Sequence, residues 1–451
     1  MNEHYLALEF DKVLNNLSAY ACCALSKSAC FELEINSNKT KIEYELSLVD
    51  SAKKLIEDSQ TSLPIDDILD IDALFKERSF IASEIFELAK NLRSARLSRN
   101  YILNSKYENL VNIAQNLYCD KAFEDEVFDI FDSELNIKDS ASDTLKSLRN
   151  SYKDTKENLK AAISALLSNP SFVENLQDYV VTDRDNRPVF QVKASCKNKV
   201  QGIVHDVSST NLTYFIEPTH LVPISNKLRQ TEVEIQTEID RILSVLSNRF
   251  KSIQNELKLN KDILIRLDVI FARAKYSIHL KANSAAITES KIIDIQAMRH
   301  PLLVEVKKDV VENDFSLGKK HDCLLITGSN TGGKTVALKT AGLMVLMTKA
   351  GLHIPSLGAK IYPFKNIFCD ISKEQSLEQG FSTFSAHIKN ISDIMDNIDS
   401  DSLVLLDELG SGTDPSEGAA LSKAILYPSR ICTLFSAFSK SNLVRLIMTS
   451  F

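Results

Sequence analysis

The chain has 451 residues, 44% of them hydrophobic and 25% charged, with a formal net charge of −7 at pH 7. That length is enough for two or three domains with substantial cores, and the acidic balance excludes a protein that coats nucleic acid through general positive charge. The eight cysteines have no zinc or CxxC spacing, no apolar run approaches membrane-spanning length, and the first ten residues carry acids where a signal peptide carries bases; we therefore expect a cytoplasmic protein with reduced thiols and no membrane partner.

Residues 1–140 have a helical pattern with few glycines or prolines, and we expect them to form a helical core. Two later stretches, 143–167 and about 225–257, repeat apolar residues at steps of three, four and seven, which is the seam of a coiled coil. We predict an antiparallel coiled-coil lever over 141–260, followed by a helical return to the core over 261–290. Two helices of a compact bundle remain the alternative, because each seam is short.

Between the two arms, residues 178–218 are rich in Val, Thr and alternating apolar positions, which predicts a small β-rich module at the tip of the lever. Residues 182–202 hold five basic side chains against two acidic ones in a chain that is acidic overall. Such a balance suits contact with nucleic-acid phosphates, although a solvated face is also compatible with it. The candidate contacts are Arg184, Arg187, Lys193, Lys197 and Lys199.

The most specific motif is GSNTGGKT at residues 328–335, which matches the phosphate-loop pattern GxxxxGK[ST]. Residues 323–327 before it read as a short buried strand, and residues 336–347 after it as a helix. Glycines let the backbone curl so that its N–H groups face a polyphosphate, and the helix presents its positive end to the same anion. The predicted nucleotide-binding residues are Gly328, Ser329, Asn330, Thr331, Gly332, Gly333, Lys334 and Thr335.

Two carboxylates complete the predicted site. Lys334 is placed to reach the β- and γ-phosphates of ATP, and the Thr335 hydroxyl to ligate Mg²⁺. Residues 403–406 form an apolar run that predicts a buried strand, with Asp407 and Glu408 at its carboxyl end, where ligands bind in open parallel sheets. Asp407 is suited to hold Mg²⁺ through water, and Glu408 to act as the catalytic base that orients the attacking water.

A helix is also expected from residue 382 to about residue 398, with Ser382 or Thr383 as its N-cap. An outward-facing, capped helix N-terminus is an anion site without a ligand in its own chain. In ATPases that close as dimers, such a segment addresses the γ-phosphate bound to the partner subunit. An ordinary capped helix is the alternative.

With these residues together, the chain resembles the MutS superfamily of ABC-type ATPases, and more closely its second bacterial subfamily. The resemblance rests on an Arg-His-Pro lead-in at 299–301 and on segments 328–340, 368–384 and 403–420. Segments 202–206 and 214–218 are similar to motifs of the second subfamily that general phosphate-loop proteins lack. We expect the similarity to run from the start of the chain to about Leu426.

The resemblance implies a P-loop, ABC-type α/β ATPase domain over 291–426, C-terminal to the mostly helical core with its lever and β-rich clamp tip. It further implies ATP and Mg²⁺ as cofactors, a head-to-head homodimer, and action on branched DNA to suppress recombination or on collided ribosomes. By the same resemblance, Ser382 and Thr383 act on the opposite subunit's nucleotide. Arg299, His300 and Pro301 lie where the family packs around the base, with an ordinary turn as the alternative.

The sequence departs from the family after Leu426. Pro428 interrupts the helix expected there, and no histidine follows His387, although the family carries a γ-phosphate-sensing histidine in this region. We therefore expect an incomplete ATPase domain, an atypical tail over 427–451, a doubtful dimer and no family endonuclease domain, as a truncated or frame-shifted gene would produce. The alternative function is an ATP-binding remnant with little hydrolysis. A transporter or chromosome-condensation ATPase shares the site chemistry but does not explain residues 214–218.

Overall fold

The computed structural model describes residues 2–75, 78–307, 309–327, 333–371, 382–407 and 445–449, and describes 382–386 and 445–449 through their backbone alone. The chain divides into two units. The first unit draws on residues 1–70, 94–119 and 256–451, and the second on residues 71–93 and 120–255. Helices α6 (Ala82–Leu103) and α12 (Gln254–Leu280) contribute residues to both.

The first unit combines helices from both ends of the chain with two sheets. Its other described helices are α1 (Glu3–Ala7), α2 (Phe10–Ser18), α3 (Ala24–Cys30), α4 (Lys39–Ser59), α7 (Glu108–Ala114), α13 (Pro301–Val306), α14 (Lys334–Lys349) and α15 (Ser382–Asn397). Its described strands are β5 (Ala286–Ile287), β6 (Ile293–Met298), β7 (Asn313–Leu317), β8 (Cys323–Ile326), β9 (Gly358–Ile361), β10 (Asn366–Asp370), β11 (Ser402–Leu406) and β12 (Arg445–Thr449).

The sheet that organises the first unit has the order β10-β11-β12-β8, and every neighbouring pair in it is parallel. The predicted strand at 403–406 is confirmed as β11, which is buried along its whole length. Leu403 and Leu405 join the large core that includes α14, whereas Val404 and Leu406 pack against α15. A strand covered by helices on both faces needs apolar residues at every position, and this explains the unbroken apolar run.

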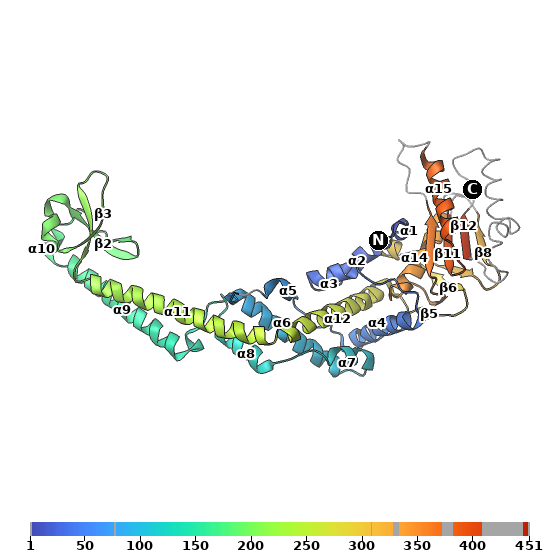
Figure 1. Ribbon diagram of the computed structural model, residues 1–451, viewed down its shortest axis with the longest axis horizontal. Helices are drawn as coiled ribbons and strands as arrows, with labels where there is room; N and C mark the ends of the chain where they lie inside the picture. The colour runs from blue at the N-terminus through green and yellow to red at the C-terminus, as the bar shows by residue number, and fades with distance from the viewer. Residues whose placement is uncertain are drawn as a thin grey trace. The chain divides into compact units, whose positions relative to one another are not determined.

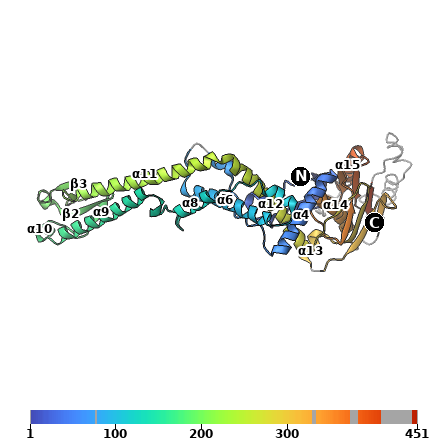
Figure 2. The same ribbon diagram turned by 90° about the horizontal axis from the view of Figure 1, so that it is seen from below.

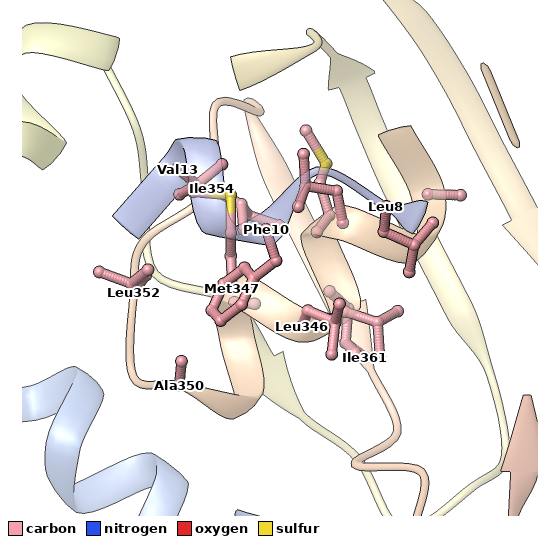
Figure 3. Close-up of a cluster of buried hydrophobic side chains, with 14 of the residues drawn as sticks. Leu8, Phe10, Val13, Leu346, Met347, Ala350, Leu352, Ile354 and Ile361 are labelled. Carbon is pink, nitrogen blue, oxygen red and sulfur yellow. The ribbon is translucent and has the colours of Figure 1, made fainter. Parts of the chain in front are cut away.

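The large core of the first unit forms between α2, α14 and the sheets (Figure 3). Phe10 and Val13 of α2 lie in the same fully buried cluster as Leu346 and Met347 of α14. At Gly342 the helix α14 passes so close to β11 that an added Cβ would overlap the side chain of Leu405 and meet Leu8 at 3.0 Å. Close packing in this core therefore fixes α14 against the middle of β11.

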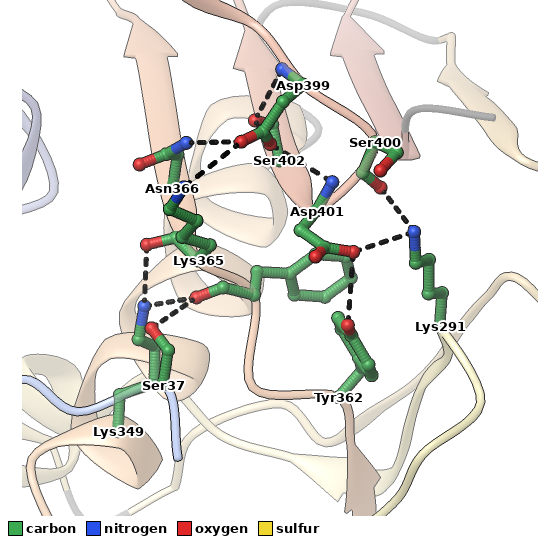
Figure 4. Close-up of polar contacts among 11 residues, drawn as sticks. Ser37, Lys291, Lys349, Tyr362, Lys365, Asn366, Asp399, Ser400, Asp401 and Ser402 are labelled. Atoms are coloured by element: carbon green, nitrogen blue, oxygen red, sulfur yellow. Dashed lines mark hydrogen bonds and ion pairs between the residues drawn. The ribbon is translucent and has the colours of Figure 1, made fainter. Parts of the chain in front are cut away.

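The second sheet, β5-β9-β6-β7, is tied to the amino ends of β10 and β11 by a polar network (Figure 4). Asp401 accepts from Tyr362 at 3.1 Å and pairs with Lys291 at 2.7 Å, and its pKa is held below the ordinary value by the hydrogen bond from Lys291. Asn366, the first residue of β10, donates to Asp399 at 3.2 Å. This end of the parallel sheet is thus occupied by side chains that bind one another.

The second unit is built on a helix pair. Helices α9 (Asp143–Leu167) and α11 (Val222–Ser252) lie side by side and lead to and from a small sheet (Figures 1 and 2). The expected helix at 143–167 is confirmed, whereas the one expected over 225–257 ends at Ser252, and α12 begins at Gln254. The unit's remaining helical elements are α5 (Ile71–Leu74), α8 (Lys121–Ile130), α10 (Pro170–Val173) and the 3₁₀ turns Asp139–Ala141 and Ala194–Lys199.

The small sheet of the second unit has the order β1-β2-β4-β3 and is antiparallel throughout. Its strands are β1 (Thr182–Arg184), β2 (Arg187–Lys193), β3 (Gly202–Val207) and β4 (Thr213–Pro218). Phe190, Val192 and Ile216 face a hydrophobic cluster that includes Leu159 of α9 and Leu221 at the start of α11. The β character expected for 178–218 is therefore confirmed, and we call this sheet the tip. No helix in the described part of the chain is long and apolar enough to cross a membrane.

Candidate functional site

The topology of the parallel sheet brings two predicted halves of a site to one edge. Strand β8 leads through residues 328–332, which lie outside the described part, to α14, and β11 leads directly to Asp407. Because all four strands are parallel, the carboxyl ends of β8 and β11 lie at the same edge of the sheet, where open α/β sheets bind ligands. Only β12 separates them, a spacing of roughly 10 Å at the usual distance between strands.

The start of α14 has the geometry of an anion site. Gly333 occupies the N-cap with a left-handed φ of 80°, which a glycine adopts without strain, and it carries no side chain to cap the helix. Among the described residues, a Cβ built at this position would meet nothing within 4 Å. Lys334 is the first helical residue and is 6% exposed, and Thr335 follows it half-buried. The first-turn N–H groups and the helix dipole favour a bound anion here.

Asp407 lies one residue beyond β11 and is 6% exposed. Its backbone N–H donates to the carbonyl oxygen of Asp370, the last residue of β10, at 2.8 Å. A buried carboxylate at the same edge of the sheet as a glycine-led helix N-terminus is the donor set that a hydrated Mg²⁺ and a polyphosphate require. The described residues of the site therefore fit a magnesium–nucleotide complex, which Lys334, Thr335 and Asp407 would hold.

The structure describes only some of the predicted site residues. Gly328, Ser329, Asn330, Thr331, Gly332 and the expected catalytic base Glu408 lie outside the described residues. Ser382 and Thr383 are described through their backbone, which is helical from Ser382 onward, so the helix expected at 382 is confirmed as α15. Because α15 connects β10 to β11, its N-terminus lies at the same edge of the sheet as Asp407.

Sequence reasoning missed a polar cluster at this edge. The Asp370 carboxylate, 7% exposed, lies 3.0 and 3.1 Å from Nδ1 of His387 and accepts from Asn390 at 2.8 Å. The signal for it was present, since an Asp ends one strand while a His and an Asn stand three residues apart on the following helix. Polar residues at i and i+3 share a helix face and can grip one partner.

The lead-in residues have structural partners in the first unit. Arg299 donates to the carbonyl oxygens of Leu280 and Lys281, each at 3.2 Å, and Pro301 opens the short helix α13. His300 is 8% exposed, and its Nδ1 has no hydrogen-bond partner in the described part of the chain. Burial lowers the pKa of His300 to about 4, so this imidazole is neutral near neutral pH.

The basic residues of the tip do not form one surface. Arg187 is bound to Glu217, which is fully buried, at 2.9 Å and donates also to Asn226, so it is part of the fold of the tip. The Arg184 guanidinium lies over the ring of Phe215, and the Lys197 ammonium over that of Tyr214. Neighbouring residues of a strand point to opposite faces, so these two cations are on opposite sides of the sheet.

The last two candidates of the tip differ in exposure. Lys193 donates to the carbonyl oxygen of Glu174 at 3.1 Å and is half-buried, whereas Lys199 is exposed. The five-residue cluster of the sequence is therefore distributed over both faces and the interior of the tip. Arg184, Lys197 and Lys199 are the members with exposed charge.

Comparison with known proteins places this arrangement in a family. The family model described as MutS domain V matches residues 324–441, past Leu426, where we expected the resemblance to end. A protein named Endonuclease MutS2 from Clostridioides difficile (strain 630) is 38% identical over 438 residues, which cover 94% of this chain and 55% of that protein. Proteins of the same name from Acetivibrio thermocellus and Clostridium botulinum (strain Okra / Type B1) are 38% and 39% identical, with 55% and 54% of their length covered.

The chain thus spans about half the length of the curated relatives it matches. Nearly all of it takes part in the similarity, including the second unit and its tip as well as the sheet that carries Lys334 and Asp407. The chain belongs to the MutS family, as a member of the MutS2 type.

Proposed function

We propose that this chain binds Mg²⁺–ATP at the carboxyl edge of its parallel sheet and hydrolyses it, and that the nucleotide cycle drives a nucleic-acid clamp of the MutS2 type. One observation carries the proposal. The glycine-led, buried Lys334 at the start of α14 and the buried Asp407 after β11 meet at the same edge of one parallel sheet. Both are the residue types that phosphoryl transfer needs, a cation for phosphate and a carboxylate for magnesium.

In this proposal each residue has a defined task. The backbone of residues 328–333 and the N-terminus of α14 cradle the phosphates, while Lys334 neutralises the β- and γ-phosphates. Thr335 and Asp407 hold Mg²⁺, which when bound neutralises charge on the transferring phosphate. Glu408 orients and deprotonates the attacking water, and the α15 N-terminus, with Ser382 and Thr383, faces the nucleotide of a partner subunit in a homodimer.

The nucleic-acid target follows from the family and from the exposed charge of the tip. Branched DNA and the RNA of collided ribosomes are the two candidates, and both offer phosphates that Arg184, Lys197 and Lys199 can contact. The acidic balance of the whole chain favours a clamp that contacts its target locally over one that coats it.

A second candidate function is ATP binding with little hydrolysis. It is favoured by the absence of any histidine after His387, because the family resemblance implies a histidine that senses the γ-phosphate in this region. The intact set of Lys334, Thr335, Asp407 and Glu408 favours the first proposal.

Measuring ATP affinity beside steady-state phosphate release separates the two. The clamp proposal predicts micromolar to submillimolar binding and turnover that Glu408→Gln abolishes while binding persists. Binding without turnover in the wild type would establish the second candidate. A folded chain that binds no ATP at millimolar Mg²⁺ would refute both.

A further inference from the structure

A carboxylate at the end of β10 connects two parts of the proposed nucleotide site. The Asp370 side chain is buried, with oxygens 3.0 and 3.1 Å from Nδ1 of His387, and Asn390 donates to it at 2.8 Å. The Asn390 amide also reaches the carbonyl oxygen of Cys369 at 3.4 Å. A carboxylate removed from water must be paired or hydrogen-bonded, so Asp370 holds His387 and Asn390 in place as firmly as they hold it.

Both partners stand on α15, as the sixth and ninth of its 16 residues. His387 and Asn390 are three residues apart and therefore share the helix face that meets β10. His387 lies less than two turns from Ser382, where α15 begins. The contact thus fixes the N-terminal part of α15 against the carboxyl end of β10, and the apolar contacts of Ile394 with Val404 and Leu406 secure the helix further along.

The main chain of Asp370 makes a separate contact, on the side of β11. Its carbonyl oxygen accepts the N–H of Asp407 at 2.8 Å, so one residue contacts α15 through its side chain and the proposed magnesium ligand through its main chain. A shift of α15 away from β10 would strip the donors from a buried carboxylate, which costs free energy, and would disturb the strand end beside Asp407. The N-terminus of α15 and Asp407 are therefore held in one geometry by a single residue.

We propose that His387 and Asn390 are positioning residues of the nucleotide site, which act through Asp370 to keep the start of α15 in register with Asp407. This inference rests on the proposed function. Nucleotide affinity depends mainly on α14 and Lys334, whereas the chemical step depends on the alignment of groups around the γ-phosphate. Loss of the contact therefore lowers turnover and leaves ATP affinity nearly unchanged.

The chain provides a matched control on the same strand. Asn366 is the first residue of β10 and donates to Asp399 at 3.2 Å, at the opposite edge of the sheet (Figure 4). Asn366→Ala removes a hydrogen bond of the same kind from the same strand without touching the nucleotide edge. A purely structural role for His387 predicts that Asn366→Ala and His387→Leu have the same consequences.

The experiment compares His387→Leu, His387→Asn and Asn366→Ala in the full chain. We expect His387→Leu to lower kcat roughly 10- to 100-fold while KM for ATP changes by less than about twofold. His387→Asn, which keeps a donor near the position of Nδ1, should recover most of the loss. Asn366→Ala should lower the melting temperature and leave kcat unchanged.

A second readout needs no catalysis. The chain contains no tryptophan, so Lys389→Trp on the exposed side of α15 introduces a single fluorescent reporter. We expect the anisotropy of this reporter to fall in the His387→Leu background and to remain at the reference value in the Asn366→Ala background. If His387→Leu does not fold, Asn390→Ala, which leaves His387 on Asp370, serves for the same contrast.

The outcomes separate the two proposals. If the wild type turns over ATP and His387→Leu matches it in kcat and in reporter anisotropy, the positioning inference is overturned and the proposed function stands. If the wild type binds ATP without turnover, the ATP-induced change in reporter anisotropy is compared between His387→Leu and Asn366→Ala. Equal changes in both variants would overturn the positioning inference. If the wild type binds no ATP, the proposed function fails, and the positioning inference fails with it.

Discussion

Polar residues are arranged in opposite ways at the carboxyl edge of the parallel sheet and in the tip. At the carboxyl edge, residues far apart in the chain converge, since Lys334, Asp370 and Asp407 all follow or end strands of one sheet. In the tip, residues close in the chain separate, because Arg184 and Lys197 lie over adjacent rings of β4 that point to opposite faces. Parallel topology gathers strand ends, whereas the two-residue period of a strand divides a local cluster.

The comparison implies that a single substitution is more damaging to function at the convergent edge than in the tip. Lys334→Ala should lower kcat/KM for ATP roughly 10³-fold, because it removes the buried cation that we propose stabilises the developing phosphate charge. Lys365→Ala is the matched control, an exposed lysine at the other end of the same sheet, and should retain wild-type kinetics. Phosphate-release assays on both variants measure the difference. Equal kinetics would contradict a functional role for Lys334 at the carboxyl edge.

Within the tip, the largest expected effect concerns folding. Glu217 is fully buried and is bound by Arg187 and His205, so Glu217→Ala should cost roughly 3 kcal/mol by removing the carboxylate that neutralises Arg187. Asp206→Ala removes the exposed partner of Arg184 on β3 and should cost less than about 0.5 kcal/mol. Hydrogen exchange of the β3 and β4 amides reports the stability of this unit directly, and equal protection in both variants would contradict the assignment.

The lowered pKa of Glu217 predicts that the stability of the tip depends on pH. Burial alone would raise the pKa of Glu217, but hydrogen bonds and the Arg187 charge outweigh it and hold the pKa below its ordinary value. A depressed pKa stabilises the folded tip above the ordinary value of 4.5, and this contribution is lost as the pH falls through the lowered folded-state pKa. Urea unfolding between pH 7 and pH 3 should show a drop in the free energy of unfolding that Glu217→Gln makes smaller, since other carboxylates such as Glu238 also have a lowered pKa. A pH profile unchanged by that substitution would contradict the prediction.

A smaller effect tests how closely α14 packs against β11. Gly342→Ala places a Cβ against the side chains of Leu405 and Leu8 and should destabilise the first unit by about 1–3 kcal/mol. Gly358→Ala is the control, because its Cβ would meet only the Gln296 side chain at 3.8 Å, an ordinary contact. Urea denaturation measures both, and a fully tolerated alanine at position 342 would show that the helix is free to move away from the strand.

The smallest effect concerns nucleic-acid contact by the tip. Arg184→Ala and Lys197→Ala should each weaken binding of a DNA junction or a structured RNA a few-fold and reduce the salt slope by about one. Because the two cations lie on opposite faces, the double substitution should be additive. Fluorescence anisotropy across a salt series provides the measurement, and strong coupling between the two positions would show that they share one phosphate.

The elements that carry the site were predictable from local pattern, whereas the contacts between them were not. The strands at 323–327 and 403–406 and the helix after the glycine-rich loop follow from apolar runs and turn residues, and the structure has them as β8, β11 and α14. The prediction that the first strand is buried was wrong, because Cys323 and Leu325 of β8 are exposed. The contact of His387 with Asp370 joins residues 17 positions apart. The sequence shows the strand-ending Asp and the His and Asn on the next helix, but it does not specify that these side chains meet.

Two further differences have physical causes. The apolar repeat through 225–257 continues across Ile253, where the backbone leaves helical geometry between α11 and α12, so periodicity alone could not show the break. Arg445–Thr449, in the tail that we expected to be atypical, pairs in parallel with both β11 and β8. Its role as a central strand depends on pairing with strands remote in sequence, which is why the local sequence did not indicate it.

The most direct test is calorimetric titration of ATP with and without Mg²⁺ into the wild type, Asp407→Asn and Asp401→Asn. Asp401 is the matched carboxylate at the amino edge, paired with Lys291 and Tyr362. We predict Mg²⁺-dependent binding in the wild type and in Asp401→Asn, and loss of the Mg²⁺ dependence in Asp407→Asn. Folded protein that binds no ATP, or equal Mg²⁺ dependence in all three proteins, would contradict a nucleotide site at the carboxyl edge.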